Sequence, residues 1–159
     1  MKILGIALIM LSACAFSREK NRAAERRLAV LEELFRLADT MKLEIGCYLR
    51  PMSEIVSSFN SEVLERYGFI SDFSSIGAYE AYLRLESRVT LGEEEKKLMA
   101  TFFSRLGKGY ADDEMKLIET FSAQLLLVLQ KEREALPKQK KLSATLSCAA
   151  ALAVIILLV

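Results

Sequence analysis

Two runs of three carboxylates are the residues of this sequence whose types and spacing could do chemistry. They are Glu93-Glu94-Glu95 and Asp112-Asp113-Glu114, and clustered carboxylates can bind a divalent cation or transfer protons. Each run also stands where an apolar pattern of helical period begins, and negative side chains stabilise the N-terminus of a helix through its dipole. We therefore expect both runs to mark helix starts rather than a metal or catalytic site.

Other residue types that support catalysis are missing or scattered. The sequence contains no histidine, which is the commonest general base and the usual partner of a nucleophilic serine or cysteine. The three cysteines, Cys14, Cys47 and Cys148, form no CxxC pair and no metal-binding spacing. No P-loop and no glycine-rich dinucleotide fingerprint is present. We expect a protein that is not an enzyme and holds no cofactor and no metal.

The charges are confined to the middle of the chain and nearly balance there. Apart from Lys2, every ionisable side chain lies between Arg18 and Lys141, a segment with 21 basic and 21 acidic residues. A nucleic-acid partner would favour a clearly basic surface, so none is expected. The segment is long enough for one domain with a modest core and too short for two.

The C-terminal end of the sequence is apolar and uncharged. Leu142 to Val159 is a run of 18 residues without a charge, preceded by Lys138, Lys140 and Lys141. As a helix it would be roughly 27 Å long, close to the roughly 30 Å hydrocarbon core of a bilayer. The pattern predicts a transmembrane helix over residues 142–159.

A second apolar stretch, Ile3 to Phe16, allows three interpretations. It is a secretory signal peptide, a lipoprotein signal with Leu11-Ser12-Ala13-Cys14 as its lipobox, or a short transmembrane helix that is retained. Cations outnumber acids just after it, and cations resist translocation across the membrane; they are Arg18, Lys20, Arg22, Arg26 and Arg27, against Glu19 and Glu25. We favour transmembrane helices at 1–17 and 142–159, with a cytoplasmic helical-bundle domain at 18–141 between them.

Helical periodicity runs through the first part of the middle segment. From Ala23 to Leu49 apolar residues recur in steps of three and four; they are Leu31, Leu34, Ala38, Met41, Ile45 and Tyr48. Pro51 should end this helix and open the next, because a proline pushes the residue before it out of the helical region. The next helix, with Ile55, Val56, Phe59, Val63 and Leu64, should end at Tyr67-Gly68, giving two antiparallel helices joined by a tight turn.

The remaining elements are also predicted as helices, and no strand pattern is present. Ser71 to Ser75 is predicted as a loop, followed by a short helix at Ala78–Leu85. Thr90-Leu91-Gly92-Glu93 fits a capping box for a helix that Gly107-Lys108-Gly109 ends. Asp112 should cap a last soluble helix reaching about Leu136, whose run Leu125–Leu129 is too wide for one face and should be covered on more than one side. The fold class is all-α, a small antiparallel bundle.

Several segments, in order over the whole chain, resemble the stage III sporulation protein AB family. After an N-terminal span, the first helix ends in Leu43-Glu44-Ile45-Gly46-Cys47-Tyr48-Leu49-Arg50-Pro51-Met52-Ser53-Glu54-Ile55. A central Phe103-Ser104-Arg105-Leu106-Gly107 precedes Asp112, and a lysine-rich lead enters a closing span that ends Val154-Ile155-Ile156-Leu157-Leu158-Val159. The most specific of these elements is the turn from Glu44-Ile45 to Pro51-Met52-Ser53-Glu54.

The resemblance implies a function in spore formation. It implies a cytoplasmic domain similar to the F domain of type II secretion and type IV pilus inner-membrane proteins. It also implies a place in the channel or secretion-like complex that joins mother cell and forespore, in the mother-cell membrane around the forespore. The implied partners are the cytoplasmic secretion-type ATPase subunit of that complex and its other membrane components. The chain departs from the family pattern at the start of the closing span, which in the family is usually rich in glycine. Here Leu142 to Ala151 contains other small residues instead, and these still let helices approach closely.

The turn around Arg50 and Pro51 is the candidate partner-binding site. Its tip should be exposed, Arg50 has no nearby partner on its own helix face in the sequence, and Glu44 and Glu54 lie on the flanking turns. We expect these four residues either to form part of the ATPase-facing surface or only to shape the hairpin. A different class of function stays open as an alternative, an extracytoplasmic lipoprotein-like factor anchored through Cys14.

Overall fold

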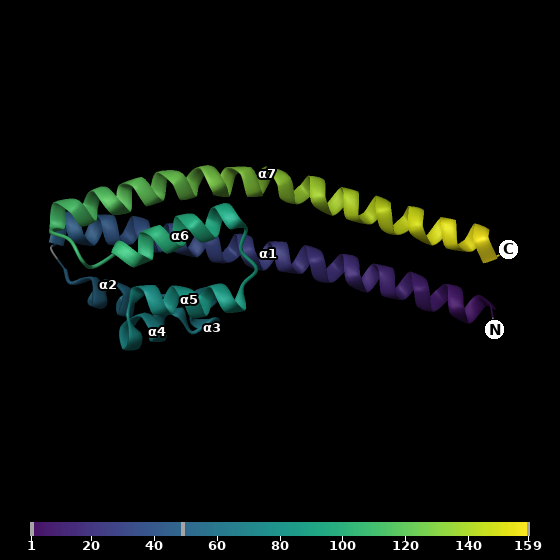
Figure 1. Ribbon diagram of the computed structural model, residues 1–159, viewed down its shortest axis with the longest axis horizontal. Helices are drawn as coiled ribbons and strands as arrows, with labels where there is room; N and C mark the ends of the chain where they lie inside the picture. The colour runs from purple at the N-terminus through teal and green to yellow at the C-terminus, as the bar shows by residue number, and fades with distance from the viewer. Residues whose placement is uncertain (1, 49, 159) are drawn as a thin grey trace. The chain divides into compact units, whose positions relative to one another are not determined.

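The computed structural model of the chain is helical over most of the residues it describes. It describes the main chain of residues 2–48 and 50–158, with side chains at 12, 15, 17–46, 50–143, 145, 146 and 149. Within these residues there are seven helices and no strand, which confirms the all-α prediction (Figure 1). The helices are α1 (Lys2–Tyr48), α2 (Met52–Ser58), α3 (Glu62–Arg66), α4 (Phe69–Ile76), α5 (Ala78–Arg88), α6 (Glu93–Arg105) and α7 (Ala111–Leu158).

The chain forms two compact units, and α1 and α7 contribute to both. Residues 27–131 form one unit, called here the helical unit. Residues 1–26 and 132–159 form the other, called here the paired ends. The helical unit holds the whole hydrophobic core found among the described side chains. The apolar stripe predicted for α1 is confirmed, because its members with described side chains are buried there: Leu31, Leu34, Ala38, Met41 and Ile45.

Aromatic rings form the centre of the helical unit. The ring of Phe103 on α6 lies 5.6 Å from Phe69 of α4, 5.6 Å from Tyr82 of α5 and 5.0 Å from Phe102, measured between centroids. Phe102 in turn stacks on Phe121 of α7 at 3.8 Å. Aromatic pairs of this kind stabilise a fold beyond the burial of their apolar area. The cluster therefore stabilises the packing of four helices around the buried ring of Phe103.

Two predictions for residues 52–76 are wrong. The single helix expected after Pro51 is two helices, because Phe59 leaves helical geometry and Ser61 begins α3 by accepting a hydrogen bond from the Leu64 amide at 3.1 Å. Residues 71–75 lie in α4 rather than in a loop. The hydroxyls there donate to main-chain carbonyls of their own helix, Ser74 to Ile70 and Ser75 to Ser71, a bond that serine can make inside a helix.

The helix starts differ in detail from the expected caps. α6 begins after Gly92, whose amide donates to the Glu95 carboxylate at 2.7 Å. The box predicted at Thr90 is therefore wrong by two residues. Likewise α7 begins at Ala111, with Tyr110 accepting from the amides of Asp113 and Glu114. Asp112 lies inside the first turn of α7 and does not cap it, although both acidic runs do stand at helix starts as predicted.

Helix α7 continues well past the predicted end at Leu136. It includes Pro137, which removes one main-chain hydrogen bond but does not end the helix. The prediction that its leucine run is covered on more than one side is also wrong within this single chain. Leu125 and Leu129 are buried, whereas Leu126 is 40 % exposed and Leu127 is 66 % exposed. One side of α7 therefore remains apolar and open to solvent.

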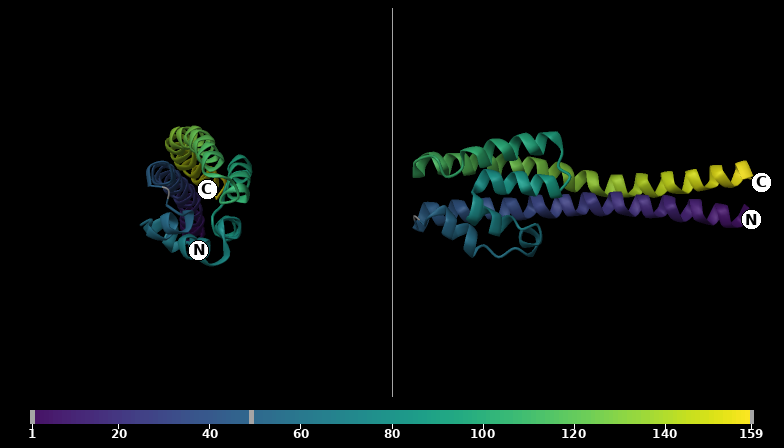
Figure 2. Two further views of the ribbon diagram at one scale, coloured as in Figure 1. Left: turned by 90° about the vertical axis from the view of Figure 1, so that its left-hand side faces the viewer. Right: turned by 60° about the horizontal axis from the view of Figure 1, so that its bottom comes forward.

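Within the paired ends, the N-terminal part of α1 runs beside the C-terminal part of α7, and N and C lie at the same end (Figures 1 and 2). The hydroxyls of Ser17 and Ser143 are hydrogen-bonded to each other. The Lys140 ammonium lies 2.6 Å from the Glu25 carboxylate. The hydrogen bond that Lys140 donates to Glu25, together with the charge of Lys140, holds the pKa of Glu25 below its ordinary value. Both side chains are therefore charged at neutral pH.

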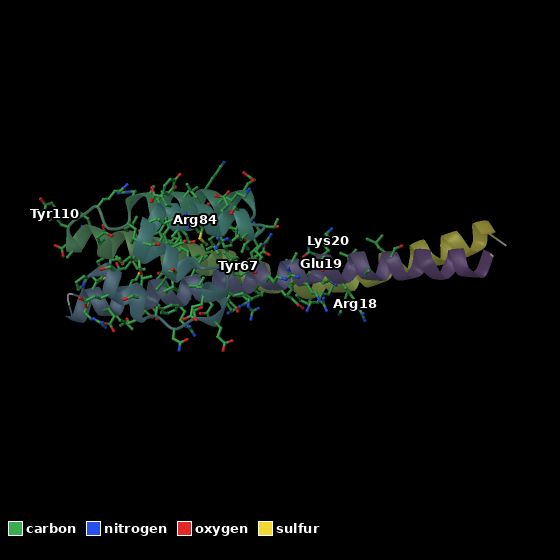
Figure 3. The ribbon with its side chains drawn as sticks, turned by 90° about the horizontal axis from the view of Figure 1, so that it is seen from below. Arg18, Glu19, Lys20, Tyr67, Arg84 and Tyr110 are labelled. Carbon is green, nitrogen blue, oxygen red and sulfur yellow. The ribbon has the colours of Figure 1, made fainter. Side chains whose placement is uncertain are left out.

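The residues expected to lie at membrane depth are only partly described. The charged residues just after the first apolar stretch, Arg18, Glu19 and Lys20, are exposed on α1 (Figure 3). The side chain of Cys14 in the lipobox, and most side chains of 1–17 and 142–159, lie outside the described residues. Among the residues that are described, no helix is both long enough and apolar enough to cross a membrane.

Truncating the central ring should strongly destabilise the helical unit. Phe103→Ala removes contacts with four other rings and should lower the free energy of unfolding by about 3 to 5 kcal/mol. Tyr110→Ala is the control, because that side chain is 86 % exposed (Figure 3) and its loss should change the free energy by less than about 0.5 kcal/mol. Denaturant unfolding followed by circular dichroism measures both. Equal stabilities would contradict the central place of Phe103.

The pairing of the two ends can be tested by a disulfide. In a chain with Cys14, Cys47 and Cys148 changed to alanine, Ser17→Cys with Ser143→Cys should form a bond on mild oxidation, because the native hydroxyls are in contact. Mass spectrometry of proteolytic fragments detects it. Ser17→Cys with Thr145→Cys is the control, since the Thr145 hydroxyl instead donates to the Lys141 carbonyl. Equal cross-linking of the two pairs would mean that the ends are not held in this register.

Candidate functional site

The candidate partner-binding site is the turn that joins α1 to α2. α1 ends at Tyr48 and α2 starts at Met52, as the position of Pro51 predicted. Pro51 has φ −59° and ψ 140°, and its carbonyl accepts from the amides of Glu54 and Ile55 at 3.0 and 3.2 Å. Pro51 thus precedes α2 and accepts its first hydrogen bonds. Leu49, and the side chains of Cys47 and Tyr48, lie outside the described residues.

The structure brings Glu44, Arg50 and Glu54 together. A guanidinium nitrogen of Arg50 lies 3.2 Å from Glu44 Oε2, and its Nε lies 3.8 Å from Glu54 Oε2. The expectation that Arg50 lacks a partner is wrong, because the turn folds the end of α1 and the first turn of α2 toward the same guanidinium. The group carries one cation and two carboxylates, and 40 % of the Arg50 side chain and 60 % of the Glu54 side chain remain exposed.

Neighbouring residues fix this group to the helical unit. Ile55 and Val56 on α2 are almost completely buried, so the short helix cannot turn away from the core without exposing them. Glu54 lies in the first turn of α2, where a negative charge stabilises the helix end. The turn therefore presents a fixed charged surface that can pair with groups of a partner.

Among the described residues, the pKa values of Tyr82 and Lys96 both move away from neutrality. Burial raises the pKa of Tyr82, with the nearby Glu86 carboxylate adding to the shift. The hydrogen bond that Lys96 donates to the Glu93 carboxylate, together with the charge of that carboxylate, raises the pKa of Lys96; the ammonium lies 3.2 Å from Glu93. Tyr82 stays neutral and Lys96 stays charged at pH 7, so neither is poised to transfer protons there.

The two acidic runs have structural partners. Glu95 is buried, caps α6 and lies 3.4 Å from the Arg27 guanidinium of α1. Glu114 is also buried and accepts from the Gly109 amide at 2.8 Å. Within the described part of the chain, no three histidine, cysteine or acidic side chains are arranged to hold a metal ion.

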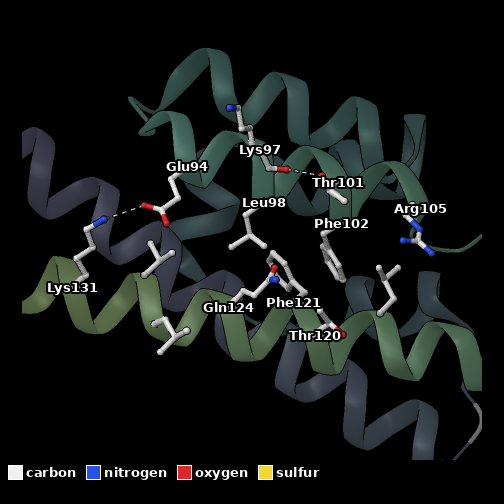
Figure 4. Close-up of a pocket in the computed structure, with 13 residues that line it drawn as sticks. Glu94, Lys97, Leu98, Thr101, Phe102, Arg105, Thr120, Phe121, Gln124 and Lys131 are labelled. Atoms are coloured by element: carbon white, nitrogen blue, oxygen red, sulfur yellow. Dashed lines mark hydrogen bonds and ion pairs between the residues drawn. The ribbon is translucent and has the colours of Figure 1, made fainter.

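A second surface feature, which the sequence did not predict, is a groove between α6 and α7 (Figure 4). Phe102, Phe121 and Leu98 form part of its wall, and Lys97, Arg105 and Lys131 lie along it. The signal in the sequence is the wide leucine run of residues 125–129, which predicts a helix covered on more than one side.

Comparison with known proteins supports the resemblance seen in the sequence. Neither a search of curated proteins nor a search of solved structures found a match. The description of the matching protein family is "Stage III sporulation protein AB", and the match spans residues 2–159. It covers the turn with Glu44, Arg50 and Glu54 as well as both apolar ends. The chain therefore belongs to the stage III sporulation protein AB family.

Proposed function

We propose that this protein is a non-enzymatic membrane component of the sporulation channel or secretion-like complex between mother cell and forespore, and that it docks a cytoplasmic ATPase to that assembly. The observation that carries the proposal is the family match over residues 2–159, which makes the chain a stage III sporulation protein. The other membrane components of the complex and the lipid bilayer are its further proposed partners.

The membrane part of the proposal rests on the sequence of the two ends. The uncharged run from Leu142 to Val159 has the length of a span, and residues 1–17 would form a slightly shorter one. Cations flank both segments on the side of the middle domain, and positive flanks favour the cytoplasm. The pairing of α1 with α7 through Ser17 and Ser143 suits two helices that enter a bilayer side by side, with 18–141 cytoplasmic.

The docking part of the proposal places the ATPase on the turn between α1 and α2. Support comes from the charged group of Glu44, Arg50 and Glu54, which is exposed and held by the buried residues of α2. The all-helical fold suits the proposed likeness to F domains. Those domains contact motor ATPases, so a rigid charged turn is a suitable contact surface.

The topology can be tested with a single cysteine. In the chain with Cys14, Cys47 and Cys148 changed to alanine, Lys116→Cys lies on an exposed position of α7. A membrane-impermeant maleimide should label it only after lysis, because residues 18–141 are proposed to be cytoplasmic. Both variants are expressed in growing cells, where the non-cytoplasmic side of the membrane is the cell exterior. A cysteine added after Val159 is the control and should react in these intact cells. Labelling of Lys116→Cys in intact cells would contradict the topology.

A lipidated N-terminus would support the alternative function instead. Mass spectrometry of the purified wild-type protein should find no chain that starts at Cys14 with an attached diacylglycerol. Finding that species would make the protein an extracytoplasmic lipoprotein-like factor, because lipobox processing follows export.

Docking through the turn can be tested by charge reversal. Arg50→Glu removes two ion pairs and places a third carboxylate beside Glu44 and Glu54. Because these groups are substantially exposed, we expect the free energy of unfolding to fall by only about 1 kcal/mol. Capture of the ATPase subunit by the purified full-length protein should be lost. Arg66→Glu, an exposed charge reversal on α3, should leave capture unchanged. Capture that survives Arg50→Glu would mean that the turn only shapes the hairpin.

A further inference from the structure

The groove between α6 and α7 is an apolar surface that the described residues leave open. It has a volume of about 590 Å³ and belongs to the helical unit. Leu98 and Val128 are half-buried in it, and Leu127 is the most exposed of its large apolar side chains, at 66 %. A contiguous apolar surface in contact with water is costly and commonly marks an interaction site.

The shape of the groove fits a helix. On α6 its lining residues recur at 94, 97, 98, 101, 102 and 105, in alternating steps of three and one that follow one helix face. The run spans about 16 Å along α6. A helix of about three turns lying along the groove would be long enough to cover it, and such helices anchor through apolar side chains at i, i+3, i+4 and i+7.

The charges along the groove select the kind of helix. Its lining contains three cations, Lys97, Arg105 and Lys131, and one carboxylate, Glu94. Glu94 is 3.0 Å from the Lys131 ammonium. Lys97 and Arg105 are exposed and form no ion pair within the described residues. Complementary potentials steer association and favour one class of partner, so a bound helix should carry carboxylates along its flanks.

We infer that this groove binds an amphipathic helix of another protein, with an apolar face flanked by acidic residues. A second copy of this chain fits less well. Its exposed apolar side chains on another helix, Tyr79 and Leu83 of α5, have two cations and two carboxylates on the same helix, Arg84 and Arg88 with Glu80 and Glu86. That helix therefore has balanced charge and lacks the acidic flanks that the cations of the groove favour. The groove is formed by different helices from the turn at Arg50, so this partner surface is additional to the proposed ATPase contact.

A designed peptide pair tests the inference directly. The probe is a stapled helix of about 14 residues with leucines at i, i+3, i+4 and i+7 and glutamates on both flanks. Its partner peptide has the same leucines with lysines in place of the glutamates. The full-length protein in nanodiscs of neutral lipid is titrated with each, and empty nanodiscs report binding to lipid. The acidic peptide should bind at least about tenfold more tightly than the basic one, and added salt should reduce that preference.

Matched variants locate the binding surface. Leu127→Gln should weaken binding of the acidic peptide about tenfold, whereas Leu126→Gln, the same change at an exposed position of α7 that does not line the groove, should leave it unchanged. Lys97→Glu combined with Arg105→Glu should reverse the preference toward the basic peptide, while Arg66→Glu should not.

Three results would overturn the inference. The first is equal binding of the two peptides by the wild-type protein. The second is equal binding of the acidic peptide by the Leu127→Gln and Leu126→Gln variants. The third is self-association in sedimentation experiments that Leu127→Gln abolishes, which would assign the groove to a second copy of the chain. Because Arg50→Glu leaves the groove intact, that variant should bind the acidic peptide normally even if ATPase capture fails.

Discussion

The contact between Phe103 and the surrounding rings is the constraint on which the helical unit depends. Helices α2 to α5 contain only 5 to 11 residues each, and isolated helices of that length are marginal in water. They persist because their buried side chains pack on a common core in which Phe69, Tyr82 and Phe103 meet. The exposed turn before α2 is therefore fixed by packing elsewhere, through Ile55 and Val56.

A buried carboxylate connects the start of α6 to α1. Glu95 binds the Gly92 amide and pairs with Arg27, so the same side chain caps one helix and contacts another. The sequence favoured Thr90 and Glu93 as the capping pair because their spacing is correct for a capping box. The spacing Gly92 to Glu95 is equally correct, and the tertiary pair with Arg27 stabilises that alternative. A local pattern cannot include a partner 68 positions earlier in the chain.

Sequence periodicity predicted the long helices well because their apolar faces repeat many times. The stripe on α1 from Leu31 to Ile45 is buried as expected. The prediction from the sequence failed at residues 71–75, where serines typical of loops donate hydrogen bonds to carbonyls of their own helix. At the candidate site, the sequence places Glu44, Arg50 and Glu54 on or beside one turn but does not predict their ion pairs. Arg50 reaches Glu44 across the end of α1, and this depends on a turn geometry that the spacing alone does not define.

The leucine run of α7 is a place where the sequence-based prediction and the structure of the single chain differ. Five consecutive apolar residues exceed one buried face, and burial of Leu125 and Leu129 leaves Leu127 in the groove open to solvent. The turn at Arg50 carries an excess of carboxylate and the groove an excess of cation. A partner suited to one surface meets like charge at the other, and like charges placed together cost several kcal/mol. The two surfaces are therefore suited to different partners, which can bind the same helical unit without competing for one site.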